Sequence, residues 1–110
     1  MMKLAMSPAA AGLIRDLLAR AAVAREAVLL TDYRSTEWHS LTFAGERHEV
    51  GLRIPGPAAA AIVERLLSGL ADAEFAIAGH IVADIAVRGR PVTHDDGAIT
   101  VDPEALTIAE

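Results

Sequence analysis

The first hydrophobic pattern in the chain is a helical one close to the N-terminus. Its apolar residues recur every three or four positions: Ala10, Leu13, Ile14, Leu17, Leu18 and Ala21. Ser7 can accept a hydrogen bond from a free amide of the first turn, and Pro8 has the backbone angle of a first helical residue. The pattern predicts a helix over about residues 8–23, with Asp16 and Arg20 paired on its exposed side.

The segment after this helix alternates between polar and apolar residues, which is typical of strands. We predict three strands, over residues 26–33, 36–44 and 47–54, with turns at Arg34-Ser35 and Gly45-Glu46. The length of the first turn decides which residues of the first strand join the apolar face, and two sets remain open: Val28 with Leu30, or Leu29 with Tyr33.

A two-residue turn at 45–46 sorts the following hairpin into an apolar and a polar face. The pairs that it predicts on the apolar face are Phe43 with His48, Leu41 with Val50, His39 with Leu52, and Glu37 with Ile54. The same turn predicts a polar opposite face on which Trp38 lies against Arg53.

The second half of the chain predicts one helix and one long hairpin. Helical spacing over residues 57–70 gives a buried stripe of Ile62, Val63, Leu66, Leu67 and Leu70. Residues 75–89 are rich in β-branched side chains and indicate a strand, with a bulge or bend at Gly79. The last hairpin is predicted to turn at Asp96-Gly97, which pairs Val92 with Val101 and His94 with Ile99.

These elements predict a single α+β domain over residues 1–110. Its sheet is expected to be antiparallel and five-stranded, in the order α-β-β-β-α-β-β, because the loops are too short for parallel crossovers. Both helices are expected to pack on one face of the sheet. The long last hairpin could extend past the subunit and pair with a second chain.

Composition adds an expectation about assembly. The chain is 53% hydrophobic but only 4% aromatic, so its core buries little area per residue and a homodimer interface would offset that shortfall.

A net charge of −5, no basic run and no Asn or Gln argue against nucleic-acid binding. The chain has no cysteine and no apolar segment long enough to span a bilayer, and Pro8 interrupts the N-terminal apolar run; we therefore expect a cytoplasmic protein. Arginine and alanine usage suggests a bacterial source.

The candidate ligand-binding residues are Glu37, His39, His48 and Asp84. Glu37 could orient His39 from two positions along the same strand, and a carboxylate among apolar residues, as at Asp84, would have a shifted pKa. The predicted register separates His39 from His48, so we expect no metal site and no cofactor. Imidazoles at the ends of an apolar face are also common without any function.

The nucleotide-binding, nucleophile-elbow and zinc-protease motifs are all absent, and no other catalytic motif is found. The sequence therefore predicts a non-enzymatic, homo-oligomeric domain, most simply a dimer, that interacts with proteins or binds ligands. The alternative is a small-molecule-binding or catalytic domain whose site on the sheet contains Glu37, His39 and His48.

Overall fold

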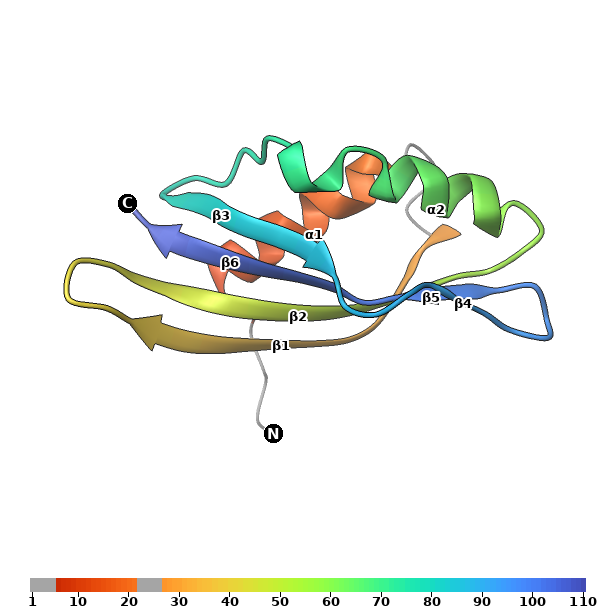
Figure 1. The fold of residues 1–110 in the computed structure, drawn as a ribbon, viewed down its shortest axis with the longest axis horizontal. Helices are drawn as coiled ribbons and strands as arrows, with labels where there is room; N and C mark the ends of the chain where they lie inside the picture. The colour runs from red at the N-terminus through yellow and green to blue at the C-terminus, as the bar shows by residue number, and fades with distance from the viewer. Residues whose placement is uncertain (1–5, 22–26) are drawn as a thin grey trace.

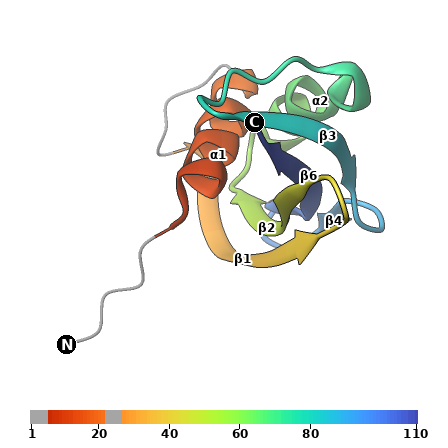
Figure 2. The same ribbon diagram turned by 90° about the vertical axis from the view of Figure 1, so that its left-hand side faces the viewer.

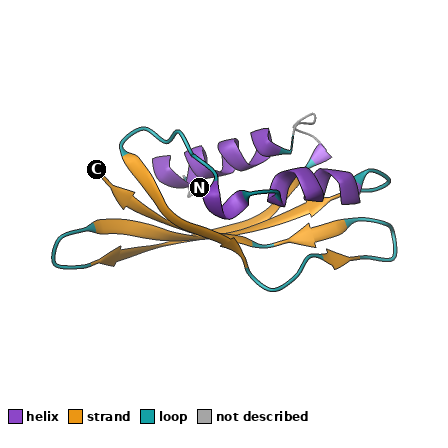
Figure 3. Ribbon diagram, turned by 45° about the horizontal axis from the view of Figure 1, so that its top comes forward, coloured by secondary structure: helices purple, strands orange, loops and turns teal. Residues whose placement is uncertain are grey.

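The computed structural model describes residues 6–21 and 27–110. In chain order its elements are α1 (Pro8–Arg20), β1 (Leu29–His39), β2 (Ala44–Ile54), α2 (Ala59–Leu67), the 3₁₀ helix η2 (Leu70–Asp72), β3 (His80–Val87), β4 (Val92–Thr93), β5 (Ile99–Val101) and β6 (Pro103–Ala109). All strand pairings are antiparallel. The predicted α+β class is confirmed (Figures 1 and 3).

The sheet is arranged around β2. One side of β2 pairs with β1, and the other pairs with β6 and β5, which in turn pair with β3 and β4. In the end view of Figure 2 the sheet curls, and α1 lies on its concave side. Helix α1 packs against α2 and β2, and α2 packs against β2 and β5. The core lies between these helices and the concave face.

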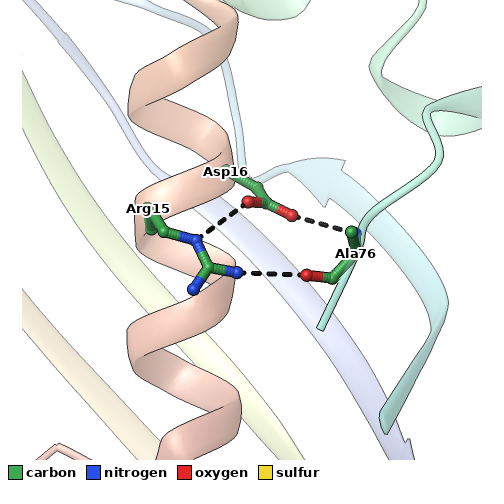
Figure 4. A network of polar contacts seen from close by, with 3 residues as sticks. All are labelled: Arg15, Asp16 and Ala76. Carbon is green, nitrogen blue, oxygen red and sulfur yellow. Dashed lines mark hydrogen bonds and ion pairs between the residues drawn. The ribbon is translucent and has the colours of Figure 1, made fainter. Parts of the chain in front are cut away.

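Helix α1 begins as its sequence predicts. The Oγ of Ser7 accepts a hydrogen bond from the Ala10 amide at 3.1 Å, and Pro8 is the first helical residue. The predicted end at residue 23 lies outside the described residues. The predicted pair of Asp16 with Arg20 is wrong, because Asp16 bonds instead to Arg15 and to the Ala76 amide (Figure 4). Arg15 in turn donates to the Ala76 carbonyl at 3.0 Å, so the two side chains bind both backbone polar groups of Ala76.

The C-terminal ends of the two helices hold each other through arginine side chains. Arg20 of α1 donates to the carbonyls of Leu66 and Ser68 at the end of α2. Arg65 of α2 donates to the carbonyl of Ala21, the C-cap of α1, at 2.9 Å. Cations at helix C-termini satisfy carbonyls that lack an intrahelical partner and interact favourably with the helix dipole. The exchange fixes the helices side by side over the sheet.

The predicted order with five strands is confirmed only in part: over the described residues the order is α-β-β-α-β-β-β-β, with six strands. Residues 29–33 and 36–39 of the first two predicted strands belong to one strand, β1, and Arg34-Ser35 lies within it rather than in a turn. Arg34 and Ser35 stay extended because they pair with Glu49 and His48 of β2. Residue 26, where the first strand was predicted to begin, lies outside the described residues.

The predicted turn at Gly45-Glu46 is also wrong. The chain turns at residues 40–43, where the Ser40 amide bonds to the Phe43 carbonyl at 2.8 Å, and Gly45 and Glu46 lie within β2. His48 therefore opposes Ser35 instead of Phe43, and Glu37 opposes Glu46 instead of Ile54. The strands have slid by an even number of residues, so the predicted faces hold although every partner changes.

The second half departs from its predicted register in a different way. Gly79 has a positive φ of 77° in the turn before β3, and the bulge falls between Val82 and Asp84. The last hairpin closes with a three-residue loop, because the His94 amide bonds to the Ala98 carbonyl, and Gly97 has a φ of 86°. Thr93 instead of His94 then opposes Ile99. Because the shift is by one residue, the side chains of one strand point to the opposite face from the one predicted.

Candidate functional site

His48 forms the centre of a row of three polar side chains that crosses the sheet, from half-buried Ser35 on β1 to buried Thr107 on β6. Its imidazole is 1% exposed, and Thr107, on the neighbouring strand β6, is 0% exposed. The Nδ1 of His48 lies 2.8 Å from the Oγ of Ser35, and its Nε2 lies 2.9 Å from the Oγ1 of Thr107. Thr107 donates to the Glu46 carbonyl at 3.4 Å, so its hydroxyl accepts from Nε2–H and Nδ1 accepts from Ser35.

Burial lowers the pKa of His48 below its usual value of 6.5. The nearby Glu46 acts to raise the pKa and His80 to lower it further, but burial has the largest effect. The neutral form is therefore favoured in the folded chain, and it uses both ring nitrogens in bonds to hydroxyl groups. Such a row stabilises three strands against one another without leaving a free lone pair for a ligand.

The structure does not gather the other predicted site residues around His48. Glu37 and His39 are exposed near the end of β1, where they oppose Glu46 and Ala44. His39 is thus about four residues, or roughly 13 Å, along the sheet from the level of His48. Both lie on the predicted face and are exposed there.

Asp84 lies on the opposite face of the sheet from His48. It opposes Leu106 of β6, whereas His48 opposes the next residue, Ala105, and successive residues of a strand point to opposite faces. Asp84 is exposed and lines a small cleft of about 180 Å³ whose charged residues also include Arg47, Arg88 and Glu104.

The cations of this cleft are already paired. Arg47 bonds to Glu104 at 2.5 Å, and Arg88 lies 3.4 Å from Glu49 and 3.5 Å from Glu104. The side chains form a mixed-charge surface network of the kind that contributes little to stability pair by pair. Within residues 6–21 and 27–110, no three His, Asp or Glu side chains gather closely enough to hold a metal ion. No helix in that part of the chain is long and apolar enough to cross a membrane.

An apolar groove of about 1080 Å³ lies between α1 and the start of β1. Arg15 is the one charged residue in its described lining, which otherwise consists of Met6, Pro8, Ala11, Gly12, Ile14, Leu18, Ala19, Val28, Leu29 and Leu30. Its volume slightly exceeds the usual range of small-molecule sites, roughly 300–1,000 Å³. None of the residues predicted to bind a ligand lines this groove.

The edge of the sheet at β1 is the second surface that sequence reasoning missed. Among the described strands, β1 pairs with β2 alone, so one side of its backbone has no strand beside it. The hairpin of β1 and β2 projects beyond the helices (Figure 1). Most of the large exposed apolar residues belong to it: Leu29, Leu30, Leu41 and Phe43. Leu41 is fully exposed at the tip, where its side chain contributes nothing to the core.

The side chain of Trp38 lies on the convex face of this hairpin. A Cβ placed on Gly45 would lie 3.1 Å from the indole ring, so the glycine leaves room for the ring to cross β2. Among the described residues, the Trp38 Nε1 is the buried side-chain polar atom without a hydrogen-bond partner. The predicted contact of Trp38 with Arg53 is wrong, because Trp38 opposes Gly45 and Arg53 bonds to Asp96.

No protein-family model matches the chain, and comparisons with curated proteins and with solved structures likewise give no match. Its function must therefore be argued from its own geometry.

Proposed function

We propose that this chain is a non-enzymatic interaction domain of the bacterial cytoplasm that works as a homo-oligomer, most simply a dimer. The observation that carries the proposal is the long edge strand β1 with exposed apolar residues at both of its ends. Exposed strand edges pair readily with other strands, and chains that stay monomeric usually protect them. Exposed Leu29, Leu30, Leu41 and Phe43 give apolar area that a partner can bury.

The chemistry of the sheet supports a binding role over a catalytic one. His48 is the histidine with a resolved pKa shift, yet both of its ring nitrogens already have hydroxyl partners. It lines neither the groove nor the cleft. Glu37 and His39 are exposed at the end of β1. A protein partner can contact side chains on such an open surface, whereas a small molecule is usually bound in a pocket.

Self-association is tested by the mass of the purified chain in solution. We expect sedimentation velocity and light scattering to give twice the mass of one chain at high micromolar concentration, with dissociation on dilution. The cause is burial of the exposed apolar residues of the β1–β2 hairpin. A strict monomer throughout that concentration range would overturn the proposal.

The apolar groove favours a second candidate, a small-molecule-binding domain. We expect Nile red, a neutral apolar dye, to bind there with increased fluorescence, because the described lining is almost entirely aliphatic. Ala11→Phe should weaken the signal, because the added ring occupies part of the groove. Ala60→Phe, an exposed position on α2 outside the groove, is the matched control and should retain it. Unchanged dye binding by Ala11→Phe would exclude the groove as the site.

A further inference from the structure

We propose that two copies of this chain associate by antiparallel pairing of β1 with β1, about a two-fold axis that lies between the two copies of Thr36. This inference rests on the proposed self-association and specifies its surface and register. The result is one continuous sheet that runs through both subunits, with the helices of each copy on the same side.

The edge at β1 is better suited to this pairing than the edge at the other side of the sheet. On β3 the ladder is interrupted by the bulge between Val82 and Asp84, and Gly89 and Pro91 separate it from the two-residue strand β4. Bulges and prolines are devices that keep an edge from pairing. On β1 the irregularity falls at Leu30–Asp32, and residues 32–39 then pair with β2 without interruption.

The faces of the sheet restrict the register of such a pair. Residues that oppose each other in an antiparallel ladder point to the same face. The two-fold axis must therefore lie between the two copies of one residue, so that this residue opposes itself across the interface. An axis at Arg34 or at Glu37 would oppose each of these charges to its own copy, which is destabilising. Centres near the middle of the regular segment pair the most residues, and this leaves Ser35 and Thr36.

Thr36 is the better of the two centres. An axis at Ser35 would oppose Asp32 to the partner's Trp38, which places a carboxylate beside an electron-rich aromatic ring. An axis at Thr36 opposes Arg34 to the partner's Trp38 on the convex face, a cation–π pair that forms twice. It also opposes Thr36 to its own copy, and threonine pairs across strands are favourable.

The same axis brings the exposed apolar groups together. The tip of each hairpin, with Leu41 and Phe43, is carried alongside the start of the partner's β1, where the partner's Leu29 and the partner's Leu30 are exposed. Burial of these side chains adds apolar area at both ends of the paired strands. Backbone pairing, charge matching and apolar contact therefore favour one arrangement.

Cysteine cross-linking tests the register directly, because the chain has no cysteine of its own. Thr36→Cys should form a disulfide-linked dimer under mild oxidation, since residues opposed across an antiparallel pair have Cα atoms within disulfide range. Asp32→Cys is the matched control on the same edge. Its two copies would lie about eight residues apart along the strands, roughly 27 Å, and should not cross-link.

The outcomes separate this inference from the proposed function. If the wild-type chain dimerises but Thr36→Cys does not cross-link, or Asp32→Cys cross-links instead, then β1 pairing at Thr36 is wrong and self-association stands. If the wild-type chain is monomeric, both fail.

A second measurement tests the contact with Trp38. Arg34→Ala should weaken the dimer about tenfold in sedimentation experiments, because two cation–π pairs are lost. Arg90→Ala, an exposed arginine outside β1, should leave dimerisation unchanged. Equal dimer affinity of Arg34→Ala and the wild type would overturn the register centred on Thr36.

Discussion

Gly45→Ala is expected to lower the free energy of unfolding by about 3 kcal/mol. Gly45 lies in β2 between Trp38 of β1 and Ile108 of β6. A Cβ on this residue would overlap the backbone carbonyl oxygen of Thr107, and a strand backbone cannot rotate aside as the end of a side chain can. The methyl group must therefore push β6 away from β2 and weaken the hydrogen bonds between them. Urea unfolding followed by the fluorescence of Trp38, at fixed protein concentration, measures the loss.

Gly51→Ala is the matched control, since it adds the same methyl group to a glycine of the same strand. The nearest atoms to its Cβ belong to the side chains of Asp32 and Thr31, which can move. We expect a loss of less than about 1 kcal/mol for this variant. Equal losses for the two glycines would show that the approach of β6 to Gly45 is not what makes this position intolerant.

His48→Ala is expected to cost about 3 kcal/mol at neutral pH, because it leaves a cavity and removes the partner of the Ser35 and Thr107 hydroxyls. The cost should be smaller at pH 5. Burial lowers the pKa of His48 in the folded chain below 6.5, so protonation favours the unfolded chain. The contribution of His48 is complete above its ordinary pKa and is lost as the pH falls from 6.5 through the lowered value.

Urea unfolding of both chains across this pH range measures the difference. The control is His39→Ala, which removes an exposed imidazole from the neighbouring strand and should change stability by no more than about 0.5 kcal/mol. A gap between wild type and His48→Ala that stays constant from pH 7.5 to pH 5 would contradict a buried, neutral His48.

The β1–β2 hairpin shows how far alternation along a strand can predict a structure. Alternation has a period of two residues, so it assigns His48, Val50, Leu52 and Ile54 to one face, and all four are buried there. Any even slide of one strand preserves that assignment. Position 45–46 resembled a turn because glycine favours turns, whereas Gly45 is needed where β6 approaches β2 closely.

The candidate site was only partly accessible to the same reasoning. The sequence singled out His48, and the structure gives it a distinctive environment. Its partners could not be predicted, because Thr107 lies 59 residues away and meets His48 only after β6 has paired with β2. The predicted turn at Arg34-Ser35 also took Ser35 out of the strand from which its hydroxyl reaches the imidazole. The edge position of β1 had no sequence signal, because strand order is a property of the assembled sheet.

The sequence by itself determined the local features of this protein. These are the cap of α1 at Ser7 and Pro8, the apolar stripes of both helices, and the face of β2 that is buried, each of which depends on neighbours a few residues away. Only the tertiary structure decided the register of the strands, the partners of His48 and the exposure of the β1 edge. These depend on contacts between distant segments, and several alignments of the same alternating pattern satisfy the local preferences equally well.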